Sequence, residues 1–146
     1  MSFNEGALLE PLSVAIQGVR RSNMKAGSTC LVFGAGAVGL LCAFAAKMHG
    51  CGNIVMADID AGRLQFALDA GFVSAVVTVD AKRPSSIEEK LEYAKGVASK
   101  ISALQWPDKA SVGQLDVTFE CTGVETCLQS SIYVRFHPLI ILKQLI

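Results

Sequence analysis

Residues 29–40 read TCLVFGAGAVGL. The first five residues are apolar or β-branched and show no polar alternation, which is typical of a strand buried on both faces of a parallel sheet. Gly34, Gly36 and Gly39 follow in the spacing G-x-G-x-x-G, and the apolar segment 38–49 is long enough for a buried helix. A strand, a glycine turn and a helix in direct succession predict the opening unit of an α/β fold.

The same alternation continues on both sides of this unit. Pro11 suits the first turn of a leading helix, and Ser85 with Glu88 gives a capping-box signal for a later one. Strands alternating with helices predict a Rossmann-type parallel sheet with helices on both faces and right-handed crossovers. The further strands are expected at residues 53–57, 75–79 and 115–119, and the helices at 10–21, 60–70, 85–104 and 124–133.

The composition excludes several classes of protein. The chain has 146 residues, 51% hydrophobic and 18% charged, which excludes a disordered chain and fits one domain. Its formal net charge is zero, so no long-range field favours nucleic acid or an anionic membrane. No run reaches the roughly 18 apolar residues of a membrane span, and the first residues lack the basic start of a signal peptide. We therefore expect a cytoplasmic chain whose five cysteines, without a CxxC pair, are buried thiols.

Asp58 gives the glycine motif its context. The bare motif arises by chance in about one such chain in ten, but here it follows a strand, opens a helix and precedes an acid at the end of the next strand. In a dinucleotide site Gly34 permits the tight turn, and Gly36 lets a diphosphate approach the backbone. Gly39 lets the helix pack on the sheet, and Asp58 accepts hydrogen bonds from the adenosine ribose. The alternatives are a structural glycine turn and a helix N-terminal acid.

Asp58 also bears on the choice of cofactor. A carboxylate at this position favours a free 2′-hydroxyl and repels a 2′-phosphate, which favours NAD over NADP. Arg63 follows shortly after, and an arginine in this region can accept a 2′-phosphate, so NADP stays open.

Four segments resemble the coenzyme-binding part of the medium-chain dehydrogenase/reductase superfamily, in particular its zinc-dependent polyol dehydrogenases for sorbitol, xylitol and L-arabinitol. They are residues 6–14 (GALLEPLSV), 32–40 (VFGAGAVGL), 57–60 (ADID) with Arg63 and Leu64, and 119–123 (FECTG). The resemblance runs from about residue 3 to about residue 133. It implies an NAD-binding domain whose parent enzyme oxidises a sugar alcohol to a ketose by hydride transfer to NAD.

The resemblance also implies roles for individual residues around the cofactor. Val38 packs at the diphosphate turn, Asp58 holds the adenosine ribose, and Arg63 lies beside the adenosine. Thr122 follows a strand and faces the cofactor.

Glu10 matches a family glutamate beside the catalytic zinc, where it contacts the metal-bound water or the substrate. The alternative from the residues alone is a helix N-terminal carboxylate stabilised by the helix dipole. The zinc itself is held in the family by residues of an N-terminal catalytic domain, whose Cys, His and Glu ligands have no counterparts in this sequence. His49 and His137 match no catalytic position, so we expect them to be structural or exposed.

The last residues depart from the family. Relatives continue with a Gly-Gly turn and further strands that carry the subunit interface of these usually homo-oligomeric enzymes, whereas residues 134–146 form an apolar tail. Only residues 139–142 offer a possible edge strand, so we expect a sheet incomplete at its C-terminal end. The chain divides into a helical lead-in (1–25), a dinucleotide-binding domain (26–133) and the tail (134–146).

Two functions follow. The first is the NAD-binding domain of a zinc-dependent polyol dehydrogenase, with NAD and the parent's polyol as partners, inactive alone for lack of the zinc-binding domain. The alternative is a non-catalytic module that binds NAD or another protein.

Overall fold

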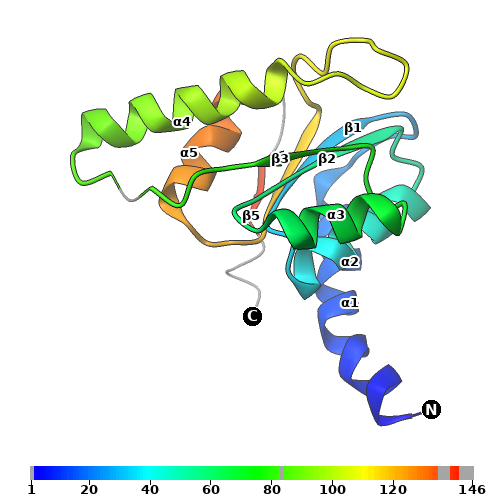
Figure 1. The fold of residues 1–146 in the computed structure, drawn as a ribbon. Helices are drawn as coiled ribbons and strands as arrows, with labels where there is room; N and C mark the ends of the chain where they lie inside the picture. Colours follow the sequence, from blue (N-terminus) through cyan, green and yellow to red (C-terminus); the bar gives the residue numbers. More distant parts are fainter. Residues whose placement is uncertain (1, 83, 135–138, 142–146) are drawn as a thin grey trace.

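A computed structural model describes residues 2–82, 84–134 and 139–141. The elements alternate along the chain, and the described strands form one parallel sheet in the order β3-β2-β1-β4-β5 (Figure 1). The predicted Rossmann-type α/β fold is therefore confirmed. The elements are α1 (Phe3–Ser22), β1 (Thr29–Phe33), α2 (Ala37–Met48), β2 (Asn53–Asp58), α3 (Ala61–Asp69), β3 (Ala75–Thr78), α4 (Ile87–Ser102), β4 (Val117–Glu120), α5 (Glu125–Val134) and β5 (Leu139–Ile141).

Helices cover both faces of the sheet, as the unbroken apolar strands predict. Side chains alternate along β1, so Cys30 and Val32 join a core with α1, α2 and α3, whereas Leu31 and Phe33 join a second core with α4 and α5. Figure 1 shows the two groups of helices on opposite sides of the strands. The central strands are thus buried on both faces of the sheet, which fixes their register.

The leading helix begins earlier than predicted. Ser2 is the N-cap, its hydroxyl accepts the Glu5 N–H, and the Glu5 carboxylate accepts the Ser2 N–H in return. This capping box satisfies the helix start seven residues before the expected one. Pro11 consequently lies inside α1, not in its first turn, and removes one interior hydrogen bond.

The start of α4 is displaced by one residue for a similar reason. Ser86, not Ser85, is the N-cap, and its box partner is Glu89. The Glu89 carboxylate also accepts hydrogen bonds from the backbone N–H and the hydroxyl of Ser85, and these bonds lower its pKa. Both serines therefore form hydrogen bonds with Glu89, and the sequence pattern alone did not show which of them is the N-cap.

The C-terminal edge agrees with expectation where it is described, and the expected burial of the cysteines is confirmed for three of the five. β5 pairs with β4 in parallel, which confirms the predicted edge strand for Leu139–Ile141, while residue 142 and His137 lie outside the described residues. Cys30, Cys42 and Cys51 are buried, and Cys121 and Cys127 are half-buried. Among the described helices none has the length and hydropathy needed to cross a membrane.

The topology points to one edge of the sheet. β1 lies between β2 and β4, so the chain turns to opposite sides of β1 in its first and second halves. In open parallel sheets ligands bind outside the carboxyl ends of the strands at such a switch point. The carboxyl ends of β1, β2 and β4 bear Gly34, Asp58 and Glu120.

Candidate dinucleotide-binding site

Two glycines of the turn after β1 are required by the fold itself. Gly34 has φ +100°, and a Cβ there would lie 3.1 Å from Thr122 Cγ2. A Cβ on Gly39 would lie only 1.8 Å from the Gly34 carbonyl oxygen, so the helix could not pack this closely on the turn. The predicted structural roles of both glycines agree with this geometry.

Gly36 differs because the fold does not require it. Its φ of −81° suits any residue, and a Cβ there would meet no heavy atom within 4 Å among the described residues. Gly36 is the N-cap of α2, and no side chain of the described part of the molecule caps this helix. The first N–H groups of α2 are thus available beside open space, which is the arrangement that binds a phosphate or another anion.

Val38 lies in the first turn of α2. Its side chain is half-buried and packs against the core under the sheet. The side chain of Val38 therefore anchors the start of α2 to the core. Its backbone N–H belongs to the first turn of the helix.

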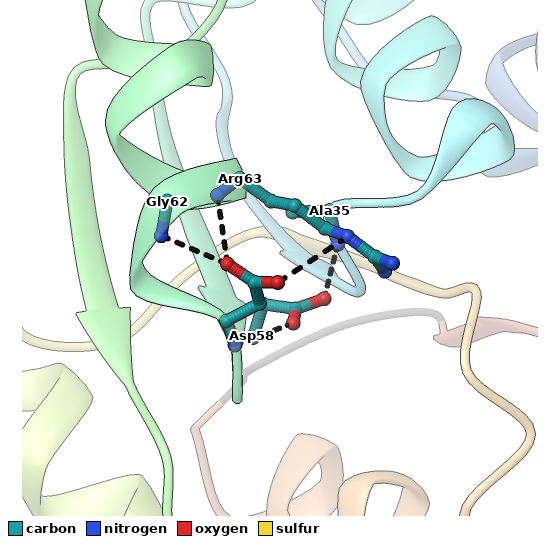
Figure 2. A network of polar contacts seen from close by, with 5 residues as sticks. Ala35, Asp58, Gly62 and Arg63 are labelled. Atoms are coloured by element: carbon teal, nitrogen blue, oxygen red, sulfur yellow. Dashed lines mark hydrogen bonds and ion pairs between the residues drawn. The ribbon is translucent and has the colours of Figure 1, made fainter.

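Asp58 lies at the same turn (Figure 2). Its Oδ2 accepts the Ala35 N–H at 2.6 Å, and its Oδ1 accepts the Asp60 N–H at 2.9 Å. The carboxylate is half-buried and held between the glycine turn and the start of α3. The structure thus brings together the glycine turn after β1 and the acid at the end of β2, which are one helix and one strand apart in the sequence.

Arg63 is held at the rim of this site by Asp60. Asp60 caps α3 by accepting the N–H groups of Gly62 and Arg63, and its second oxygen lies 3.6 Å from Arg63 Nε. The Arg63 side chain extends from α3 toward the side of the glycine turn and is 62% exposed (Figure 2). An exposed pair of this kind is weak, so the guanidinium can exchange partners.

The turn after β4 supplies a residue that the sequence reasoning missed. Glu120 is only 1% exposed, and its carboxylate accepts the N–H groups of Thr122 at 2.8 Å and Gly123 at 2.9 Å as well as the Thr122 hydroxyl. The Thr122 hydroxyl oxygen in turn accepts the Val124 N–H. An acid at the last position of a buried strand, followed by Cys-Thr-Gly, was the available signal.

Thr122 is thereby placed against the glycine turn. Its Cγ2 limits the space at Gly34, and the neighbouring Cys121 N–H donates to the Phe33 carbonyl at 3.0 Å. Burial raises the pKa of the nearby Cys127 thiol, a hydrogen bond with Thr122 opposes this, and the Glu120 and Asp58 carboxylates add to the rise. The thiol therefore stays protonated near neutral pH.

Glu10 does not belong to a helix start. It lies exposed on α1, more than one turn inside the helix that begins at Phe3, so its alternative interpretation as a dipole-stabilised N-terminal acid is wrong. His49 is the exposed C-cap residue of α2. Within residues 2–82, 84–134 and 139–141 no three His, Cys, Asp or Glu side chains are grouped as metal ligands, so these residues by themselves do not fit a catalytic zinc.

Several known proteins are similar to this chain in sequence. Residues 37–135 match the family described as zinc-binding dehydrogenase. The chain is 39% identical over 137 residues to L-arabinitol 4-dehydrogenase of Aspergillus niger and 37% identical over 133 residues to sorbitol dehydrogenase of Bos taurus. These alignments cover 93% and 91% of this chain but 34% and 33% of the relatives, so the chain spans about one third of their length.

Solved structures share its fold. A zinc-binding dehydrogenase from Sinorhizobium meliloti bound to NADP matches with a TM-score of 0.68 at 25% identity, over 90% of this chain and 34% of that one. 2R,3R-butanediol dehydrogenase from Bacillus subtilis matches with a TM-score of 0.62 at 29% identity, over 97% of this chain and 37% of that one. The chain therefore belongs to the zinc-binding dehydrogenase family and corresponds to the Rossmann-type nucleotide-binding region of its members.

Proposed function

We propose that this chain binds NAD at the turn between β1 and α2. The observation that carries the proposal is Gly36, a glycine that the fold does not need, beside the uncapped start of α2 and next to Asp58. A diphosphate has the charge and the acceptor oxygens that these free N–H groups require. The ribose hydroxyls can donate to the Asp58 carboxylate, which accepts from backbone N–H groups in their absence.

The charges beside Asp58 favour NAD over NADP. Asp58 and Asp60 place two carboxylates at the ribose end, and the guanidinium of Arg63 already pairs with Asp60. A 2′-phosphate would have to displace this pairing against two negative charges, whereas a 2′-hydroxyl needs only an acceptor. The turn at Thr122 lies across β1 from Asp58, so we place the nicotinamide end of the cofactor on that side.

The parent reaction proposed for this region is oxidation of a secondary alcohol of a sugar alcohol to a ketose. The support is the activity that the names of the relatives state, since these relatives include L-arabinitol 4-dehydrogenase, sorbitol dehydrogenase and D-xylulose reductase. NAD, when bound, accepts the hydride from the alcohol carbon. By resemblance, Glu10 contacts the substrate or the zinc-bound water in the parent, and we expect no turnover by residues 1–146 alone.

A second candidate is a module that binds NAD without catalysis. It is favoured by the complete dinucleotide turn in a chain whose described residues group no metal ligands. The two candidates share the cofactor site and differ in whether a polyol is oxidised.

Calorimetry and a turnover assay test both parts. Titrations with NAD, NADH and NADP should give saturable binding, tightest for the two forms without a 2′-phosphate. Absence of heat with all three at about 1 mM would contradict the cofactor site. The same preparation, with zinc, NAD and sorbitol, xylitol or L-arabinitol, should form no NADH, and sustained NADH formation would contradict the expected inactivity.

A further inference from the structure

Two pairs of cysteines meet inside the molecule, although their members lie far apart in the sequence. The Sγ atoms of Cys30 and Cys51 are 3.0 Å apart, and those of Cys42 and Cys121 are 4.0 Å apart. All four are free thiols in the structure. A disulfide joins its sulfurs at about 2.05 Å, so the first pair lies about 1 Å from bonding distance and the second about 2 Å. The first pair is therefore the better placed to form a covalent bond.

Backbone hydrogen bonds hold the first pair together. Cys30 is the second residue of β1, and Cys51 lies two residues before β2, so both lie at the amino ends of neighbouring strands. The Cys51 N–H donates to the Ala46 carbonyl at 3.0 Å, and the Gly52 N–H donates to the Ser28 carbonyl at 2.8 Å. The main chain on both sides of the pair is thus fixed, and the two thiols face each other because of it.

The loop that carries Cys51 approaches the start of β1 closely. A Cβ on Gly52 would lie 2.9 Å from the Gly27 carbonyl oxygen, so no larger residue fits there unless the backbone moves. Gly50, on the other side of Cys51, has φ +97°, and its carbonyl accepts the Gly27 N–H at 2.8 Å. The two glycines that flank Cys51 therefore allow the contact between the thiols.

The surroundings of the pair set the order in which its thiols react. The Cys51 sulfur lies 3.0 Å from the Ser28 carbonyl oxygen and 3.4 Å from that of Asn53, in addition to the Cys30 sulfur. Cys30 is fully buried, whereas Cys51 is 8% exposed. The contact with Cys51 raises the pKa of the Cys30 thiol well above its ordinary value, and burial adds to the rise. We therefore expect Cys51 to react first with an oxidant from solvent and Cys30 to follow.

We propose that Cys30 and Cys51 form an intramolecular disulfide when the chain is exposed to hydrogen peroxide. The peroxide transfers one oxygen to the Cys51 thiol, which gives a sulfenic acid and one water. The Cys30 sulfur then attacks the Cys51 sulfur, the S–O bond breaks, and the departing hydroxide takes the Cys30 proton as a second water. The two thiols lose two electrons and two protons, and one peroxide becomes two waters. Dithiothreitol reverses the modification by reducing the disulfide to the two thiols.

The bond joins the two ends of the unit that carries the glycine turn. Residues 31–50, which lie between the two cysteines, contain the rest of β1, the turn and all of α2. Closing this loop removes freedom from the unfolded chain and so stabilises the folded one. The cysteines lie at the amino ends of the strands, whereas Gly34 and Asp58 lie at the carboxyl ends. The inference therefore does not depend on the proposed cofactor site.

Peptide mapping after oxidation tests the pairing. The reduced chain is treated with hydrogen peroxide, its remaining thiols are alkylated in urea, and it is cleaved with trypsin, which separates residues 26–47 from residues 48–63. We expect these two peptides to be joined through Cys30, with Cys42 alkylated, as tandem mass spectrometry distinguishes. Dithiothreitol should separate the two peptides again.

Refolding tests the same pairing without the barrier that burial sets. The chain is unfolded in urea, where every thiol is accessible, and refolded in a mixture of oxidised and reduced glutathione. The linkage between Cys30 and Cys51 should predominate at equilibrium. Five free cysteines in both experiments, or predominance of another pair after refolding, overturns the proposal.

Variants and thermal unfolding give a second readout. Cys51→Ala should abolish the linkage and leave Cys30 open to alkylation, and Cys51→Ser serves the same purpose if the alanine variant does not fold. Cys127→Ala is the matched control and should keep the linkage, because Cys127 contacts no other sulfur among the described residues. The disulfide-bonded wild type should melt at least about 3 °C above its reduced form. Equal melting temperatures of the two forms would contradict a bond that closes this loop.

Discussion

The turns that lead from β1 into α2 and from β4 into α5 stand side by side at the switch point, yet they satisfy their N–H groups differently. After β4, the N–H groups of Thr122 and Gly123 donate to Glu120, and that of Val124 donates to the Thr122 hydroxyl. After β1, a side chain takes only the Ala35 N–H, through Asp58, and α2 begins without a side-chain cap from the described residues. The first turn of α5 also bears Glu125, whereas the first turn of α2 bears no charge.

This difference indicates which of the two turns can bind an anion. The β4–α5 turn carries its own carboxylate and is complete as a structural unit. The β1–α2 turn leaves N–H groups and open space, at the cost of a weaker helix start. A diphosphate is therefore expected at α2 and not at α5, and the variants below alter each turn in the direction of the other.

The largest effect is expected for Gly39→Ala. A Cβ 1.8 Å from the Gly34 carbonyl oxygen cannot be accommodated unless the helix moves away from the turn. We expect a loss of about 3 kcal/mol or more in the free energy of unfolding, measured by urea denaturation. Gly96→Ala, in the interior of α4 with no neighbour within 4 Å among the described residues, should instead raise this free energy by about 1 kcal/mol. Similar stabilities of the two variants would contradict the close packing of the turn.

The next effect is expected for Glu120→Ala. This change leaves the Thr122 and Gly123 N–H groups without their acceptor, which should lower the free energy of unfolding by about 2 kcal/mol. Glu120→Gln keeps one acceptor oxygen and should lose about half as much. Thermal unfolding of both variants measures which of them loses more stability. An alanine variant as stable as the wild type would show that Glu120 does not hold the turn.

Gly36→Ser should separate binding from stability. Serine is as good an N-cap as glycine or slightly better, so the free energy of unfolding should stay within about 0.5 kcal/mol of the wild type. Its side chain, however, fills the open space and caps the helix start, as Glu120 and Thr122 do in the other turn. Calorimetry should show NAD affinity reduced by at least about tenfold. Undiminished affinity would place the diphosphate elsewhere.

The smallest effect is expected for Asp58→Asn. The amide keeps an acceptor oxygen for the Ala35 N–H, loses the one for the Asp60 N–H, and removes the charge beside the ribose. The ratio of NAD to NADP affinity should fall by about tenfold, mostly through tighter NADP binding. Competition titrations measure this ratio, and an unchanged ratio would assign cofactor choice to Asp60 and Arg63.

The sequence predicted the parts of this site that depend on local pattern. The buried strand, the spacing of Gly34, Gly36 and Gly39, and an acid ending the next strand are all short-range signals, and they sufficed for the β1–α2 turn. Glu120 was missed because its role depends on accepting N–H groups of its own turn, and no periodicity reports that.

The helix starts show the same limit. Pro11 and Ser85 each offered a plausible start for a helix, and in both cases a stronger capping box lay nearby, at Ser2 with Glu5 and at Ser86 with Glu89.

The most direct test of the account is a titration of the ¹⁵N-labelled chain with NAD, followed through its backbone amide resonances. The account predicts saturable shifts that are largest for residues 36–39, with smaller shifts at Asp58 and little change at the start of α5. Shifts centred on residues 123–126, or no saturable change at about 1 mM NAD, would contradict the claim that α2 is the diphosphate-binding helix.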